Sequence, residues 1–182
     1  MAAGDRPLFR SAHQALLFAF TFSATQHGTA AAGERQLAEF ARDRYERTPG
    51  SGRGLRGLDG AAQAGMIRRR VEEMTPLHAA ALIARFAILS PATRQAACSV
   101  LALRARHGLA APQDIRALTL LVRRHFGLRV NLPRLADECG VTERTAQRWA
   151  LEVRRWARPI EEHAMHRIEV QLEDAGVVAR AC

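Results

Sequence analysis

The sequence contains no lysine, so all 27 of its basic residues are arginines. Its three cysteines, Cys98, Cys139 and Cys182, are too scattered for a disulfide framework or for zinc-ligand spacing. No apolar run approaches the length of a membrane span, because the most apolar segment covers only residues 16–22. These absences predict a cytoplasmic protein with no membrane partner, no metal and no cofactor.

Strand signals are also missing, since β-branched and aromatic residues are sparse and no segment alternates between polar and apolar residues. Apolar residues instead recur at helical spacing. We therefore expect an all-α protein, a multi-helix orthogonal bundle with a C-terminal helix-turn-helix. Its predicted parts are an N-terminal helical segment (1–47), a Gly/Arg-rich loop (48–60), a helical core (61–130), the helix-turn-helix (131–158) and an acidic C-terminal helix (159–182).

Prolines, glycines and capping residues set the expected helix ends. The helices predicted before the helix-turn-helix cover residues 11–26, 34–47, 61–74, 77–89, 91–107 and 112–127. Pro159 is expected to break or kink the chain. A separate last helix over residues 160–175 would then end at Gly176 as its C-cap.

The segment Leu132–Leu151, LPRLADECGVTERTAQRWAL, has the spacing of a helix-turn-helix. Ala136 at its fifth position lets two helices cross closely, and Gly140 at its ninth permits a positive φ in the turn. Asn131 and Thr142 are the expected N-caps of the two helices. The apolar residues expected to face the core are Leu135, Cys139, Val141, Ala146 and Trp149. An ordinary helical hairpin is the alternative.

The second helix of this segment separates into two faces when its residues are placed at intervals of about 100°. One face is apolar and centred on Val153. The other face has Leu151 as its one apolar residue and otherwise holds Arg144, Gln147, Arg148, Glu152, Arg154, Arg155 and Arg158. A recognition helix in the major groove of DNA needs such a polar face.

The polar face supplies the candidate DNA contacts. Arg144 and Arg148 are candidates for bidentate contacts to guanine, and Gln147 for a contact to adenine. Phosphate contacts are expected near the helix start and along its flank, from Thr142, Thr145 and Arg155. Each of the arginines, taken alone, is equally consistent with a solvated surface charge.

The positive charge is concentrated around the helix-turn-helix. Residues 91–158 hold thirteen arginines and five acidic residues, a net charge of +8, and the whole chain carries +9. This concentration is typical of a nucleic-acid-binding surface. Residues 159–182 are acidic instead, with two arginines and five acidic residues.

The Gly/Arg-rich loop and the acidic last helix each allow two interpretations. The Gly/Arg-rich loop, with five glycines beside Arg53 and Arg56, either contacts DNA phosphate or a protein partner, or is a plain linker. It lacks the lysine and Ser/Thr of a P-loop. The acidic last helix carries an apolar stripe that either packs back on the domain or pairs with a second copy in a homodimer.

The order of the pieces resembles the Q-type antitermination proteins of phages. The comparable parts are the glycine-rich basic stretch Gly50–Met74, the apolar helices to about Phe126, and Leu135–Trp156, which is like the helix-turn-helix of sigma-factor region 4. The resemblance implies DNA contact by Arg144, Gln147 and Arg148, and implies double-stranded DNA and RNA polymerase as partners in the bacterial host cell. The zinc-binding cysteine cluster of some members is absent, and the acidic last helix has no counterpart.

The expected function is that of a sequence-specific, phage-type transcription regulator, with late-gene antitermination as its narrower form. A phage DNA-packaging or assembly protein that uses the same motif is one alternative. A protein-interaction module whose basic face binds an acidic partner is another. No esterase, metalloprotease or dinucleotide-binding motif is present in the sequence, so we do not expect an enzyme.

Overall fold

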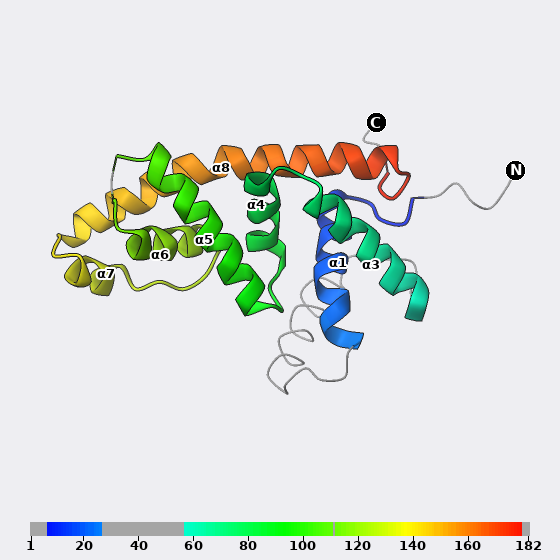
Figure 1. Ribbon diagram of the computed structural model, residues 1–182, viewed down its shortest axis with the longest axis horizontal. Helices are drawn as coiled ribbons and strands as arrows, with labels where there is room; N and C mark the ends of the chain where they lie inside the picture. The colour runs from blue at the N-terminus through cyan, green and yellow to red at the C-terminus, as the bar shows by residue number, and fades with distance from the viewer. Residues whose placement is uncertain (1–6, 27–56, 111, 180–182) are drawn as a thin grey trace, which may run out of the picture. The chain divides into compact units, whose positions relative to one another are not determined.

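The computed structural model describes residues 7–26, 57–110 and 112–179, which form α-helices and one isolated β-bridge (Figure 1). The expected all-α class is therefore confirmed. The helices are α1 (Ala12–Gln26), α3 (Gly57–Glu72), α4 (Pro76–Phe86), α5 (Pro91–Gly108), α6 (Ile115–His125), α7 (Leu132–Glu138) and α8 (Glu143–Asp174). The chain divides into two compact units, which we describe separately.

The first unit contains α1, α3, the segment Phe86–Ser90 and the chain from Met165 onward. Helices α1 and α3 pack against each other. Gly60 permits this approach, because a Cβ atom there would lie only 2.4 Å from the ring of Phe22. The β-bridge joins the two ends of the unit: the Phe9 N–H donates to the Val177 carbonyl at 3.0 Å. Both termini of the described chain are thus held in one core.

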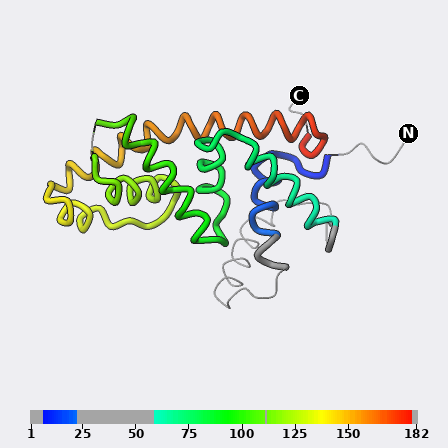
Figure 2. The backbone as a smooth tube through the Cα atoms, in the orientation of Figure 1, coloured from blue at the N-terminus to red at the C-terminus, as the bar shows by residue number. Residues whose placement is uncertain are grey.

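The second unit comprises residues Thr75–Arg85 and Pro91–Ala164. It contains α4, α5, α6, α7 and α8 as far as Ala164, and α5 packs beside α6 (Figure 2). Its largest fully buried side chains come from three of these helices and from the residue after α6: Leu82, Leu101, Leu118, Leu121, Val122 and Phe126. This apolar core positions α7 and the start of α8.

Several helix ends follow the capping residues as predicted. The Asn131 side chain accepts a hydrogen bond from the Arg134 N–H at 3.1 Å, at the start of α7. Gly176 follows the end of α8 with a φ of +67°. Its N–H donates to the Glu173 carbonyl, and the Val177 N–H donates to that of Leu172, which is the pattern of a Schellman C-cap.

Other predicted helix ends were wrong. Helix α3 begins at Gly57, so the last four residues of the predicted loop 48–60 are helical. Helix α6 begins at Ile115 rather than Pro112, because the Asp114 carboxylate caps it by accepting from the Arg116 N–H at 2.8 Å. Helix α4 ends at Phe86 rather than residue 89. The predicted helix 34–47 and loop residues 48–56 lie outside the described residues.

The sequence predicted a break or a kink at Pro159. A break is wrong, since α8 continues as one helix from Glu143 to Asp174 (Figure 2). A proline removes one backbone hydrogen bond from a helix interior. Here the helix is fixed on both sides of the proline, by buried Ala157 before it and buried Ala164 after it. Pro159 itself is exposed, so water can bond the carbonyl that loses its partner. The predicted separate C-terminal helix is therefore the second half of α8.

Candidate nucleic-acid interface

The turn between α7 and α8 has the conformation that the sequence predicts. Gly140 adopts a φ of +64°. Its N–H donates to the Asp137 carbonyl at 3.1 Å, and the Val141 N–H donates to the Ala136 carbonyl at 3.0 Å. These two bonds close α7 with a glycine in the left-handed region, which other residues adopt only at a cost. The turn therefore sets the direction in which α8 begins.

Polar side chains at the start of α8 bind one another. The Thr142 Oγ1 accepts from the Thr145 N–H at 3.3 Å and lies 3.0 Å from the Thr145 Oγ1. Gln147 donates from Nε2 to the Glu143 Oε1 at 3.0 Å. Thr142 is thus the N-cap that the sequence predicts, and Gln147, the candidate for adenine, is tied to a neighbouring carboxylate.

The two faces of α8 are arranged as the helical spacing predicts. Ala146 and Val153 are fully buried, and Ala157 is nearly so. We call Arg144, Arg148, Arg154 and Arg155 the arginine face. All four are exposed, and within the described part of the chain none of them forms an ion pair. Four positive charges thus remain available on the side of α8 that faces away from its core.

Three residues expected in the core of the helix-turn-helix are only partly buried. Cys139, Val141 and Trp149 are intermediate in exposure. The second tryptophan of α8, Trp156, lies against the end of α5, where a Cβ at Gly108 would meet its indole Nε1 at 3.0 Å. Trp156 is itself only partly buried, so the core contact of this part of α8 relies mainly on small buried residues such as Ala146, Val153 and Ala157.

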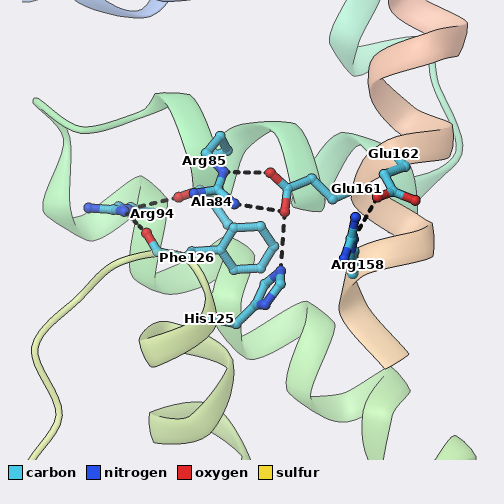
Figure 3. Close-up of polar contacts among 8 residues, drawn as sticks. All are labelled: Ala84, Arg85, Arg94, His125, Phe126, Arg158, Glu161 and Glu162. Carbon is cyan, nitrogen blue, oxygen red and sulfur yellow. Dashed lines mark hydrogen bonds and ion pairs between the residues drawn. The ribbon is translucent and has the colours of Figure 1, made fainter. Parts of the chain in front are cut away.

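A polar cluster binds α8 to α4 and to the end of α6 (Figure 3). The Glu161 carboxylate accepts from Arg85 at 2.5 and 2.8 Å, and one of its oxygens lies 3.1 Å from the His125 Nε2. Arg94 donates to the carbonyls of Ala84 and Phe126 at the ends of α4 and α6. Glu161 therefore ties α8 to α4 and α6, Arg94 of α5 binds the ends of α4 and α6, and the cluster fixes α8 beyond its arginine face.

The sequence did not predict this cluster, because its members are far apart in the chain. Arg85 lies 76 residues before Glu161, and His125 lies 36 residues before it. The one local signal was the group of cations at the end of α6, which suits a helix C-terminus. His125 belongs to that group, yet its side chain is only 8% exposed and faces a carboxylate.

Burial raises the pKa of the Glu161 carboxyl, but the hydrogen bonds from His125 and Arg85 outweigh it and lower that pKa to about 2. The carboxylate is therefore charged at neutral pH. Burial raises the pKa of the Cys98 thiol, which lies fully inside the unit. Such a thiol is a packing group rather than a nucleophile.

Two further candidate residues of the sequence analysis, Arg53 and Arg56 of the predicted loop, fall outside the described residues. Among residues 7–26, 57–110 and 112–179, no three His, Cys, Asp or Glu side chains gather into a metal-binding group, and no helix is long and apolar enough to cross a membrane. Comparison of the chain with protein-family models, curated proteins and solved structures finds no match.

Proposed function

We propose that this protein is a sequence-specific regulator that binds double-stranded DNA by placing the first half of α8 in the major groove. The observation that carries the proposal is the arginine face: four exposed arginines without an ion pair in the described chain, opposite a buried apolar stripe. A major groove about 12 Å wide admits one helix, and guanidinium groups match guanine and phosphate acceptors there.

Some exposed arginines of the described chain are neutralised by a glutamate about one helical turn further along, and the four arginines of the arginine face are not. Three arginines outside this face pair with a glutamate four residues later, at 2.7 to 3.0 Å: Arg69 with Glu73, Arg134 with Glu138 and Arg158 with Glu162. On the arginine face, Arg144 is followed at that interval by another arginine and Arg155 by Pro159. Arg148 is followed by Glu152, but the two form no ion pair within the described part of the chain. The side chains of the face therefore keep their donors for a partner.

The position of each of the four arginines along α8 determines which part of the DNA it would contact. The first residues of a recognition helix meet base edges, and later residues meet the backbone. Arg144 and Arg148 would therefore bind guanine O6 and N7, while Arg154 and Arg155 would bind phosphates. A base contact adds specificity, and a phosphate contact adds affinity that falls with salt.

Selection of bound fragments from a random duplex pool at about 0.15 M salt tests the proposal, because weak electrostatic binding is partly screened there. We expect a common site, and Arg148→Ala should relax the base preference at one position of it. Arg104 of α5 is exposed and offers a control with the same change in charge. Arg104→Ala should leave the selected site unchanged.

The other functional classes give different results in the same assay. Recovery of unrelated fragments by a large, stable oligomer, measured by light scattering, would favour a packaging or assembly protein. Failure to retain any duplex would favour a module that binds an acidic protein. Either outcome would contradict the proposed regulator. A palindromic site would indicate that the protein binds as a homodimer.

The resemblance to Q-type antitermination proteins extends the proposal to RNA polymerase as a second partner. Single-round transcription by purified bacterial polymerase, on templates with and without the selected site upstream of a terminator, tests this extension. We expect readthrough to rise only when both the protein and the site are present. Unchanged termination would contradict antitermination and leave the proposal of DNA binding standing.

A further inference from the structure

Leu151 interrupts the arginine face with an apolar side chain. It is 46% exposed, and it follows Arg148 by three residues and precedes Arg155 by four. Residues at these intervals lie in one row along a helix, so Leu151 lies between two guanidinium groups that form no ion pair within the described ranges of the chain.

The core of the second unit makes little use of Leu151. The buried stripe of α8 contains Ala146, Val153 and Ala157 on the opposite side of the helix. A single exposed leucine is ordinary on a protein surface, and Leu103 of α5 is another, at 53%. Leu151 differs from Leu103 in its position on the protein. A ligand that binds the arginine face must also cover Leu151.

The chemistry of the major groove identifies what such a leucine contacts. The 5-methyl group of thymine is the apolar group that bases present there, and apolar side chains recognise it. Three residues advance a helix by about 4.5 Å, close to the roughly 3.4 Å between successive base pairs. Leu151 therefore lies about one base pair from the position of Arg148.

We propose that Leu151 contacts the 5-methyl group of a thymine in the base pair next to the guanine bound by Arg148. This inference rests on the proposed DNA binding by α8. It assigns a role in sequence specificity to Leu151, whose side chain lies among the arginines of the arginine face and has neither a charge nor a hydrogen-bonding group. The resulting preference is for a guanine followed or preceded directly by a thymine on the contacted strand.

Deoxyuridine lacks this methyl group and keeps the base pairing of thymine, so it is the probe. Each thymine of the duplex recovered from the random pool is replaced singly by deoxyuridine, and dissociation constants are measured by fluorescence anisotropy. For the natural protein, one replacement beside the guanine should weaken binding about fourfold, the effect of one buried methyl group. Leu151→Ala should bind the thymine and deoxyuridine duplexes equally well.

Leu103→Ala, which removes an equally exposed leucine outside the arginine face, is the matched control and should behave as the natural protein does. Full sensitivity to deoxyuridine in Leu151→Ala, or no sensitivity at any position in the natural protein, would overturn the inference while specific DNA binding stands. If the natural protein retains no duplex at all, the proposed function fails and the inference falls with it. These results are distinguishable in one titration series.

Discussion

Arg85 holds Glu161 in a bidentate ion pair, with Nε 2.5 Å from one carboxylate oxygen and Nη2 2.8 Å from the other. The same guanidinium lies 5.4 Å from the centre of the Phe126 ring. Glu161 follows Arg148 by thirteen residues on one continuous helix. The pair therefore fixes the orientation of α8 within the second unit. It thereby also fixes the direction in which the exposed arginine face points.

The first prediction concerns the pH dependence of this pair. The pKa of Glu161 is about 2 in the folded protein, below the ordinary glutamate value of 4.5. Because the folded value is the lower one, the carboxylate stabilises the fold above about pH 4.5, and this contribution disappears as the pH falls toward 2. Its size is about 3 kcal/mol. Urea unfolding of the natural protein and of Glu161→Gln should therefore differ at pH 7 and converge near pH 2.

His125 and Arg85 would face a neutral amide in Glu161→Gln, so the measured difference at neutral pH includes the loss of both partners. Glu162→Gln is the control, because Glu162 is exposed and forms an exposed ion pair with Arg158 four residues before it. Its effect should be small at every pH. A difference between the natural protein and Glu161→Gln that does not change with pH would contradict the lowered pKa.

The second prediction concerns the turn between α7 and α8. Gly140→Ala should destabilise the protein by about 1–2 kcal/mol, because alanine is strained at a φ of +64° although nothing lies within 4 Å of its Cβ. Gly65→Ala is the matched control, since Gly65 lies inside α3 with equally open space and no positive φ. That substitution should stabilise by about 0.5–1 kcal/mol. The stability of both variants is measured by thermal unfolding. If both substitutions raised the unfolding temperature, or both lowered it, this account of the turn would be contradicted.

The third prediction concerns Pro159 in the interior of α8. Pro159→Ala restores a backbone donor and relieves the clash with the preceding turn, so it should stabilise the protein by about 1–3 kcal/mol. Chemical denaturation at neutral pH measures this effect. A destabilised variant would show that α8 depends on the proline, contrary to the role of Ala157 and Ala164 in fixing the helix around it.

Local signals in the sequence predicted the local features of this fold. Asn131, Thr142, Gly140 and Gly176 act where they were expected because a cap or a turn depends on a few neighbouring residues. The buried and exposed sides of α8 also followed from helical spacing, which is a property of one segment.

Features that depend on tertiary packing were not predicted from the sequence. A proline is unfavourable in an isolated helix, and the buried alanines that hold α8 together around Pro159 are recognisable only once the helix is packed. The Arg85–Glu161–His125 cluster joins three helices across 36 to 76 residues. Trp149 illustrates the same limit, because its helical position placed it on the apolar side while packing left it only partly buried.

The fourth prediction concerns Glu152, the one acidic residue of α8 between Arg144 and Arg158. Removing its charge should strengthen the attraction of duplex DNA, because negative charge beside the arginine face repels phosphates. Glu152→Gln should therefore tighten binding of the selected duplex at low salt, and the gain should shrink as salt increases. Glu73→Gln, in the turn directly after α3, is the control that makes the same change of charge elsewhere and should not affect affinity. A gain that is independent of salt would contradict an electrostatic origin.

The most direct test of the central claim compares two double substitutions in the same binding titration. Arg144→Ala with Arg148→Ala removes the two arginines assigned to base contacts, whereas Arg104→Ala with Arg106→Ala removes two exposed arginines of α5. Dissociation constants for the selected duplex are measured by fluorescence anisotropy at about 0.15 M salt. Binding through α8 predicts a loss of at least about 30-fold for the first protein, from two base contacts, and little change for the second. Equal losses in both proteins, or no loss in the first, would contradict the assignment of the arginine face as the DNA-binding surface.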